Sequence, residues 1–367
     1  MKVGRRAGAR LAACGLVLLT AYCSPLTAHS AASEWKRQKT GTFAWLHAVH
    51  FIDRERGWAA GGKGALLSTT NGGRDWKVMP APSEDTLRDI HFADGLTGWI
   101  VAERDIYKLR THDEARSYLL KTTDGGDTWS RVEVVGEEVN ARLVRARFAD
   151  ADHGWVFGEE GALFATADGG RTWARQRVPT RHLLLGGAFH DARTGWLVGA
   201  GGTFLHTSDG GATWRAAVLV PSCSFNAAGA PAAQFTPAAA PAPRINAVSF
   251  IDERRGWAVG SGGSVLSTTN GGRSWSARAS GTDADLLDVK FFDEREGFAI
   301  GSGGTVLHTT DGGANWVLRP TETTHQLERL HFLDRQHGWA VGFGGTILLY
   351  EGAAHTRPRR REDPRLR

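Results

Sequence analysis

The sequence has few cysteines, few tyrosines and no apolar run long enough to span a bilayer comfortably. Only three cysteines occur among 367 residues, and Cys14 and Cys23 both lie in the N-terminal segment. If that segment is removed, Cys223 alone remains and no internal disulfide can form. No stretch has helical periodicity of useful length, which argues against a helical fold. No glycine-rich phosphate loop and no Cys/His zinc spacing occurs, so we expect no cofactor and no metal.

Both ends of the chain differ from the body between them. Residues 1–32 join a basic start to a short apolar run and end in "SAA", a pattern typical of a signal peptide. We therefore expect export to a periplasmic or extracellular location. The tail 353–367 is rich in arginine, is predicted to be disordered, and offers a basic contact for an anionic membrane surface. Each end carries a net charge of +4 out of a total of +5, so the body 33–352 carries −3, which argues against nucleic-acid binding.

Glycine, in contrast, is abundant, and much of it lies in a repeated motif. The stretch "HTTDGGANW" at 308–316 has five counterparts, which begin at residues 68, 121, 165, 206 and 267. Each follows a marker such as "GWAVG" at 256–260, and each marker follows a phenylalanine such as Phe250. The unexpanded spacing is 41 residues, as from Trp275 to Trp316. Turn residues divide each unit into four short strands, which is the size and pattern of one blade of a β-propeller.

The repeated motif is best explained as a structural turn. An aspartate can bond backbone amides two residues further on, and glycine tolerates positive φ. The tryptophan that follows is expected to fill the wedge between neighbouring blades. We therefore predict structural roles, and neither catalysis nor metal binding, for the motif residues. These are Asp124, Asp168, Asp209, Asp311, Trp76, Trp129, Trp173, Trp214, Trp275 and Trp316.

The number of blades follows from a mismatch between the two ends of the chain. Seven "GW"-type markers occur, but only six are followed by the motif. Trp35 lies 41 residues before Trp76 and is therefore in register with the motif tryptophans. We predict that residues 34–38 supply the fourth strand of the last blade, after "TILLY" at 346–350. The fold class is thus all-β: a seven-bladed propeller over 33–352, closed by its N-terminal strand, with no open sheet edge.

The motif resembles the Asp-box, or BNR, repeat of sialidases, sortilin-type receptors and some xyloglucan hydrolases. Combined with "GWAVG" and seven units over residues 34–350, it is similar to the photosystem II stability and assembly factor family. This resemblance implies a non-enzymatic protein-binding propeller that assists the assembly or stability of a membrane-protein complex. Its expected partner is a membrane-protein assembly intermediate. We expect the chain itself to be a monomer.

Two groups of residues are candidates for partner binding. The innermost strands should line a central channel, and the side chains one and three positions before each phenylalanine should face it. The long insertions fall on the links opposite the Asp boxes, and loops on a rigid scaffold commonly bind partners. The channel candidates are His50, His91, Arg145, Arg147, Lys290, Arg329 and His331, and the insertion candidates are Arg104, Lys108 and Arg110. A mostly basic channel could hold an acidic peptide, although ordinary solvated lining explains the same residues.

Two other hypotheses remain open from the sequence. A sialidase-like carbohydrate-active enzyme or glycan-binding protein would share the Asp boxes, but a glycosidase needs two facing carboxylates. Asp89 and Asp288 line the predicted channel on blades far apart in the ring. The three histidines occupy one strand position in consecutive blades, so they could form a zinc site or a patch that titrates near neutral pH.

Overall fold

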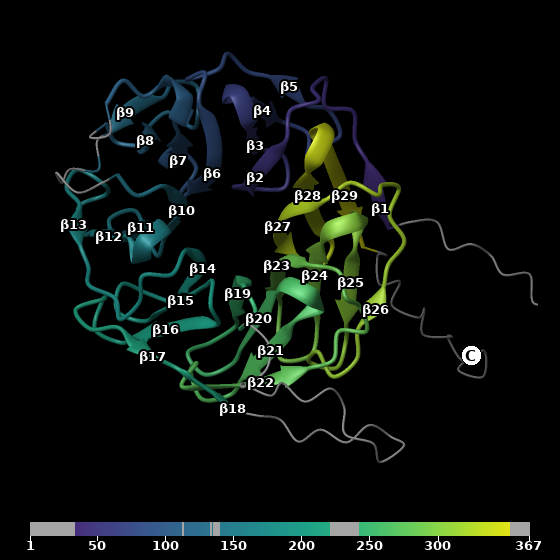
Figure 1. Cartoon of the computed structure of the whole chain (residues 1–367). Coiled ribbons are helices and arrows are strands. Elements are labelled where there is room, and N and C mark those ends of the chain that lie inside the picture. Colours follow the sequence, from purple (N-terminus) through teal and green to yellow (C-terminus); the bar gives the residue numbers. More distant parts are fainter. Residues whose placement is uncertain (1–33, 112–113, 133, 135–139, 221–241, 353–367) are drawn as a thin grey trace, which may run out of the picture. The chain divides into compact units, whose positions relative to one another are not determined.

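The computed structural model describes residues 34–111, 114–132, 134, 140–220 and 242–352. Over these residues the chain forms β-strands and short 3-10 turns, arranged as seven sheets around a central axis (Figure 1). The predicted signal peptide (1–32), the tail (353–367) and all three cysteines lie outside the described residues. Within the described part, no helix is long and apolar enough to cross a membrane. The predicted seven-bladed propeller is confirmed.

Each blade consists of four antiparallel strands, and the first strand of every blade is the innermost, since the first strands of successive blades contact one another. Blade 1 contains β2 (Leu46–Phe51), β3 (Gly57–Gly61), β4 (Leu66–Thr69) and β5 (Lys77–Val78); blade 2 contains β6 (Thr86–Phe92), β7 (Gly98–Glu103), β8 (Ser117–Thr122) and β9 (Ser130–Val132); blade 3 contains β10 (Leu143–Phe148), β11 (Gly154–Gly158), β12 (Leu163–Thr166) and β13 (Ala174–Arg175); blade 4 contains β14 (Leu184–Phe189), β15 (Gly195–Gly199), β16 (Thr203–Thr207) and β17 (Arg215–Ala216).

The remaining blades follow the same order. Blade 5 contains β19 (Ile245–Phe250), β20 (Gly256–Gly260), β21 (Val265–Thr268) and β22 (Ser274–Arg278); blade 6 contains β23 (Leu286–Phe291), β24 (Gly297–Gly301), β25 (Val306–Thr309) and β26 (Val317–Leu318); blade 7 contains β27 (Leu327–Asp334), β28 (His337–Gly342) and β29 (Thr346–Glu351). Short 3-10 turns link second to third strands: η1 (Gly62–Gly64), η2 (Ile106–Lys108), η3 (Glu159–Gly161), η4 (Ser261–Gly263), η5 (Ser302–Gly304) and η6 (Phe343–Gly345).

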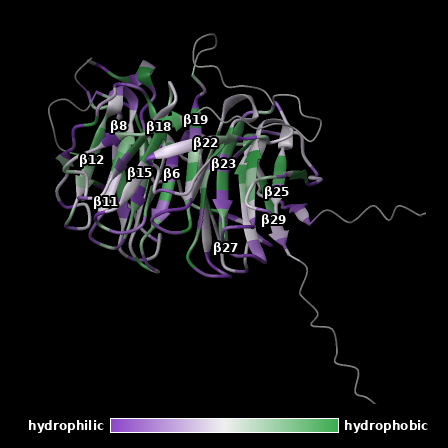
Figure 2. Cartoon of the chain, turned by 90° about the horizontal axis from the view of Figure 1, so that it is seen from below, coloured by the Kyte–Doolittle hydropathy of each residue, from purple (hydrophilic) through white to green (hydrophobic). Residues whose placement is uncertain are grey.

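Apolar side chains between neighbouring blades form the core. Figure 2 shows hydrophobic residues along the strands, between two rims of turns. At six of the seven joints the phenylalanine of one blade stacks on the marker tryptophan of the preceding blade, as in Phe291 on Trp257, whose ring centroids lie 3.8 Å apart. The same phenylalanine meets its own box tryptophan edge-on, as in Phe291 and Trp316 at 5.8 Å. Such stacked and edge-on pairs add to the stability gained from area burial. The predicted packing role of the box tryptophans is confirmed.

The Asp box differs in one detail from the predicted turn. Thr122 Oγ1, rather than the aspartate, accepts the hydrogen bond from the amide two residues after the aspartate, that of Gly126, at 2.9 Å. Asp124 Oδ1 accepts instead from the amide of Thr128, four residues on, at 3.0 Å. The hydroxyl groups of Thr122 and Thr128, which donate to Asp124, and the Thr128 amide lower the pKa of Asp124 to about 2. Gly126 has φ of 89°, and a Cβ there would lie 2.7 Å from the Trp58 indole nitrogen. The second glycine thus makes room for the neighbouring blade.

The N-terminal strand closes the ring as predicted. Strand β1 (Trp35–Arg37) pairs antiparallel with β29, so Trp35 faces Tyr350. Trp35 is fully buried, and its ring meets Phe332 edge-on at 5.9 Å, in the place of a box tryptophan. At the joint between blades 6 and 7 the marker residue is Phe298 instead of tryptophan, and it lies 5.1 Å from Phe332.

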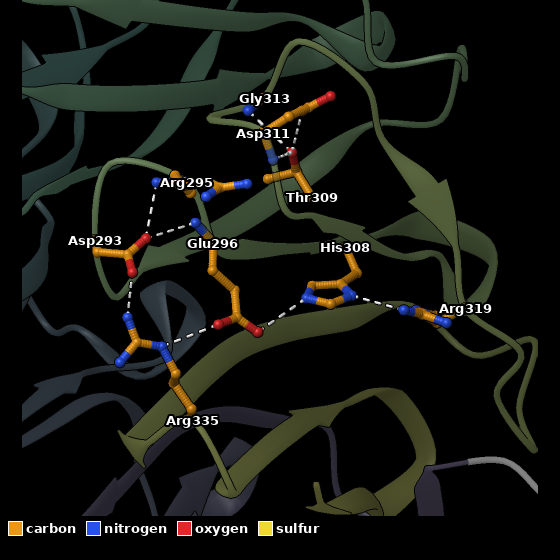
Figure 3. A network of polar contacts seen from close by, with 9 residues as sticks. All are labelled: Asp293, Arg295, Glu296, His308, Thr309, Asp311, Gly313, Arg319 and Arg335. Atoms are coloured by element: carbon orange, nitrogen blue, oxygen red, sulfur yellow. Dashed lines mark hydrogen bonds and ion pairs between the residues drawn. The ribbon is translucent and has the colours of Figure 1, made fainter. Parts of the chain in front are cut away.

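A polar network spans the outer part of the same joint (Figure 3). Arg319 donates to His308 Nδ1 at 2.8 Å, and His308 Nε2 lies 3.2 Å from Glu296. Glu296 accepts from Arg335 of blade 7 at 2.9 Å, and Arg335 also bonds Asp293. The His308 ring stacks on Phe298 at 4.2 Å. The joint between blades 6 and 7 therefore combines a phenylalanine stack with a chain of hydrogen bonds and the ion pairs of Arg335.

One strand was not predicted. The crossing from blade 4 to blade 5, interpreted from its sequence as a loop, begins with β18 (Val218–Val220). This strand pairs in parallel with β22 and makes blade 5 five-stranded. The fourth strand β22 is longer than the two- or three-residue fourth strands of blades 1 to 4 and blade 6, so it offers an edge on which another strand can pair.

Candidate functional site

The two faces of the propeller differ in their connections. On one face, which we call the box face, each Asp box docks on the turn between the first two strands, as the Gly72 amide does on Glu55 at 2.9 Å. The opposite face, which we call the insertion face, carries the 3-10 turns and the crossings between blades. Strand order places the links β7–β8, β9–β10 and β18–β19 on the insertion face. The predicted position of the insertions is therefore confirmed.

A cavity of about 360 Å³ lies in the central channel. All seven predicted channel residues line it, as do Asp89, Asp288 and Ser249. The residues two positions before each phenylalanine, such as Val49, Ile90 and Val289, are buried in the core between blades and also border the cavity.

The channel contains more cations than carboxylates. Arg145 is only 2 % exposed, its Nε donates to the Leu185 carbonyl at 2.7 Å, and its Nη1 has no hydrogen-bond partner. Burial and the neighbouring Arg329 hold the pKa of Arg145 well below its usual value. Lys290 reaches the solvent of the channel, and the surrounding walls lower its pKa despite Asp288. Buried cations without paired anions are costly, so this lining favours an anionic ligand.

The two channel carboxylates hold strands together. Asp89 is 3 % exposed, pairs with Arg147 at 2.7 Å and accepts from the Ala146 amide of the next blade at 3.0 Å. Asp288 likewise accepts from the Leu330 amide of the next blade at 3.0 Å. Each carboxylate thus ties two innermost strands. Arg147 is largely neutralised by Asp89, which leaves Arg145, Arg329 and Lys290 as the channel cations that bond no carboxylate among the described residues.

The three histidines lie side by side on blades 7, 1 and 2. The His50 ring stands 4.8 Å from that of His331 and 5.1 Å from that of His91, measured between centroids. Burial and nearby cations lower the pKa of His91 to about 3 and place those of His50 and His331 well below the usual value. The hypothesis that these imidazoles titrate near neutral pH is therefore wrong, because the cationic channel disfavours further positive charge.

The insertion candidates already have partners within the chain. Arg104 lies 3.7 Å from Glu114, and Lys108 lies 3.3 Å from Glu84. Arg110 is exposed, and its amide donates to Glu114 at 3.1 Å. The three residues sit around η2, next to the exposed side chains of Ile106 and Tyr107. Their role in partner binding stays a prediction.

Sequence comparison assigns this propeller to a family. The family profile described as "Photosynthesis system II assembly factor YCF48" (PSII_BNR) matches residues 27–135, 82–182, 173–227, 241–320 and 279–357. The chain belongs to the PSII_BNR family. No curated protein sequence matches it.

Solved structures agree with the PSII_BNR fold. A structure of YCF48 bound to a D1 peptide has a TM-score of 0.68 and 19 % identity, with 88 % of this chain and 96 % of that chain covered. YCF48 from Cyanidioschyzon merolae gives 0.67 and 20 %, with 87 % and 99 % covered. A GH74 xyloglucanase from Xanthomonas campestris gives 0.63 and 14 %, with 86 % and 53 % covered. At these identities the structural similarity shows a shared propeller fold.

The described residues of this PSII_BNR propeller do not support a zinc site at the three channel histidines. Among the described residues, one group could bring three ligand atoms within 4.8 Å of one another: His190, Asp191 and Glu253, all exposed. Asp191 Oδ1 already accepts from the amides of Arg193 and Thr194. The three channel histidines are not such a group.

Proposed function

We propose that this PSII_BNR propeller is an exported, non-enzymatic protein-binding scaffold that assists the assembly or stability of a membrane-protein complex. The observation that carries the proposal is the channel lining, in which Arg145, Arg329 and Lys290 lack a bonded carboxylate among the described residues. An acidic segment of a partner would neutralise these cations. Membership of the family and the similarity to a YCF48 that binds a D1 peptide support a membrane-protein partner.

The alternative is a carbohydrate-active enzyme, favoured by the similarity to GH74 enzymes. Glycosidic cleavage uses two carboxylates that flank one bond. In the channel, Asp89 and Asp288 are both occupied with the amides of the next blade and stand on blades 2 and 6. Their arrangement explains strand pairing and gives the alternative little support.

The proposal is tested with an acidic probe, the labelled peptide Gly-Ser-Asp-Glu-Ser-Ser-Glu-Asp-Ser-Gly, and the full mature chain. We expect binding that weakens with salt and drops about tenfold or more in Lys290→Gln and Arg329→Gln, because each substitution removes a channel cation. Arg171→Gln, which changes an exposed cation of the box face, is the matched control. Equal binding by all variants, or hydrolysis of fluorogenic β-glucans or sialosides, would contradict the proposal.

A pull-down from the native cell envelope tests whether the partner binds the insertion face. Charge reversal at Arg104, Lys108 and Arg110 should weaken capture of a membrane protein, because these residues lie on the insertion face. Reversal at Arg74, Arg171 and Arg273 on the box face should leave capture unchanged. The opposite pattern would place the partner on the box face.

A further inference from the structure

Three aromatic side chains are exposed where blade 7 meets blade 1. Phe43 is 94 % exposed, Phe343 is 49 % exposed and Trp45 is 38 % exposed. The rings of Trp45 and Phe343 meet edge-on at 5.3 Å. We call Phe43, Trp45 and Phe343 the aromatic platform. Phe343 belongs to η6, and the other two belong to the crossing from β1 to β2, so the platform lies on the insertion face.

The backbone beneath the platform is firmly held. The Gly345 amide donates to the Ala44 carbonyl at 2.8 Å, and the Phe343 amide donates to the Gln326 carbonyl at 2.9 Å. Thr40 Oγ1 donates to the Gly345 carbonyl at 2.9 Å. A surface that is ordered before binding loses less conformational entropy when a ligand arrives.

The repeat shows that the fold does not require these aromatic residues. We aligned the blades on the buried leucine or isoleucine near the start of each innermost strand, which is Leu46 in blade 1. In this alignment Trp45 and Phe43 correspond to polar or aliphatic residues in every other blade. Phe343 corresponds to glycine, glutamate, alanine or serine at the same position, directly after the second strand, in five other blades. The counterparts of Trp45 are Thr86, Arg142, Leu183, Arg244, Asp285 and Gln326; those of Phe43 are Glu84, Asn140, Arg181, Ala242, Asp283 and Thr324; those of Phe343 are Gly62, Glu159, Ala200, Ser261 and Ser302.

The platform contacts a strand that packs against another strand, which carries one of the channel cations. The Trp45 ring lies 5.4 Å from that of His47, measured between centroids. His47 is the second residue of β2 and is 9 % exposed. Strand β2 packs against β27, which carries Arg329. Burial, Arg88 and Arg329 lower the pKa of His47 to about 3, as expected if both guanidinium groups are near the ring. Arg88 bonds Glu103, whereas Arg329 bonds only the Glu328 carbonyl among the described contacts.

We propose that the aromatic platform binds an aromatic or large aliphatic side chain of an extended partner segment whose neighbouring carboxylates face Arg329. This inference rests on the proposed function and names a second feature of the partner, an apolar anchor beside its acidic residues. Aromatic anchors on a rigid surface contribute strongly to protein recognition. A stable dimer usually buries about 800 Å² per partner, which is more than three side chains provide. The charge of the channel favours an acidic peptide over a second copy.

The test compares two labelled peptides on the full mature chain. One is the acidic probe used above, and the other replaces its central Ser-Ser with Leu-Phe. We expect the Leu-Phe peptide to bind about tenfold more tightly to the native protein. In Phe43→Ser/Phe343→Ser this advantage should disappear, while binding of the Ser-Ser peptide stays unchanged. Leu318→Ser is the matched control, because Leu318 is 66 % exposed on the outer strand of blade 6.

The outcomes separate the two proposals. Equal binding of both peptides to the native protein would overturn the platform and leave the acidic-segment proposal intact. Binding of neither peptide would overturn both. Unchanged melting temperatures are expected for the double variant, because both phenylalanines are exposed. Dimerisation that the double variant abolishes, or co-sedimentation with anionic vesicles that it abolishes, would assign the platform to another occupant and overturn the inference.

Discussion

Blade 7 differs from the other six blades in how its outer edge is made. Blades 1 to 6 each use an Asp box, and at most of these joints its second glycine accommodates the marker residue of the preceding blade, as Gly272 does for Trp196. The carbonyl before that glycine accepts the indole N–H at several joints, as Gly312 does from Trp257 at 2.8 Å. Blade 7 takes its outer strand from the N-terminus and has no such box among the described residues.

This difference coincides with the one exception among the marker residues. The residue that packs against the outer edge of blade 7 is Phe298, and it is fully buried. An indole there would meet no box carbonyl, and a buried N–H without an acceptor is costly. The chain uses a phenylalanine where the acceptor is missing, and the Arg319–His308–Glu296–Arg335 network links the two blades instead. Trp196, Trp257 and Trp339 donate to a box carbonyl, whereas the buried indole N–H groups of Trp99 and Trp155 have no hydrogen-bond partner among the described residues. Marker and box are therefore linked by this bond at some joints and not at all of them.

The largest effect is expected from breaking the closure. Trp35→Ala should lower the free energy of unfolding by about 3–5 kcal/mol, because a fully buried indole is removed from a packed joint. Trp316→Ala, the same position in blade 6 but only partly buried, should cost less. Urea denaturation measures both. A chain that starts at Thr42 and melts at the same temperature as the full mature chain would refute the closure.

The next effect tests the pairing of marker and box. Phe298→Trp should destabilise the protein by about 1–3 kcal/mol, because it buries a donor that has no box carbonyl opposite it. The matched change Trp257→Phe keeps the stack but removes the bond to Gly312, and should cost about 1 kcal/mol. If Phe298→Trp is as stable as the native protein in urea denaturation, the proposed dependence is wrong.

The third prediction concerns the histidines that flank the closing joint. Because the folded state lowers the pKa of His91 to about 3, the unfolded chain binds more protons between pH 6.5 and 3, so stability falls as the pH falls through this range. At pH 5 the shifted pKa of His91 should lower the free energy of unfolding by about 2 kcal/mol relative to its value at neutral pH. His91→Gln should reduce the slope of unfolding free energy against pH. An unchanged slope in His91→Gln would contradict the prediction.

The smallest effect is expected at the 3-10 turns. Lys63 has a φ of 54°, whereas the middle residue of the corresponding turn in blade 7 is Gly344. A left-handed conformation destabilises a lysine by about 1–2 kcal/mol. Glycine avoids this strain but loses more conformational entropy on folding, which offsets up to about 1 kcal/mol of the gain. Lys63→Gly should therefore stabilise the protein by less than about 1 kcal/mol in thermal melts. Gly344→Lys should do the reverse, and a loss in both variants would contradict this reasoning.

The fold could be predicted because its signals repeat. The spacing of Trp275 and Trp316, and the position of Trp35, were enough for the blade count and the closure. Strand β18 was missed because its pairing depends on the free edge of β22, which only tertiary structure creates. Likewise, the pKa of His91 depends on how closely Arg147 and the channel walls approach it.

The candidate site was predicted in part. The alternation of side chains along a strand predicts that residues such as Arg145 face the channel. The structural role of Asp89 could not be predicted in this way, because it depends on a hydrogen bond from the Ala146 amide of the next blade. The aromatic platform is also visible in the sequence, as a departure from the repeat. Aligning the seven units shows that Phe43, Trp45 and Phe343 depart from the repeat, and departures from a repeat mark what the architecture does not need.

The pairing of β1 with β29 also constrains how the protein can fold during synthesis. The strand that the ribosome makes first pairs with the strand that it makes last, so this contact has nearly the greatest sequence separation that the propeller allows. Contacts of this kind form slowly. Blades 1 to 6 can each form from contiguous sequence as it emerges, whereas blade 7 must wait for the end of the chain. Until then β1 is an unpaired strand, and its early segment is the part of the nascent chain most in need of protection from aggregation.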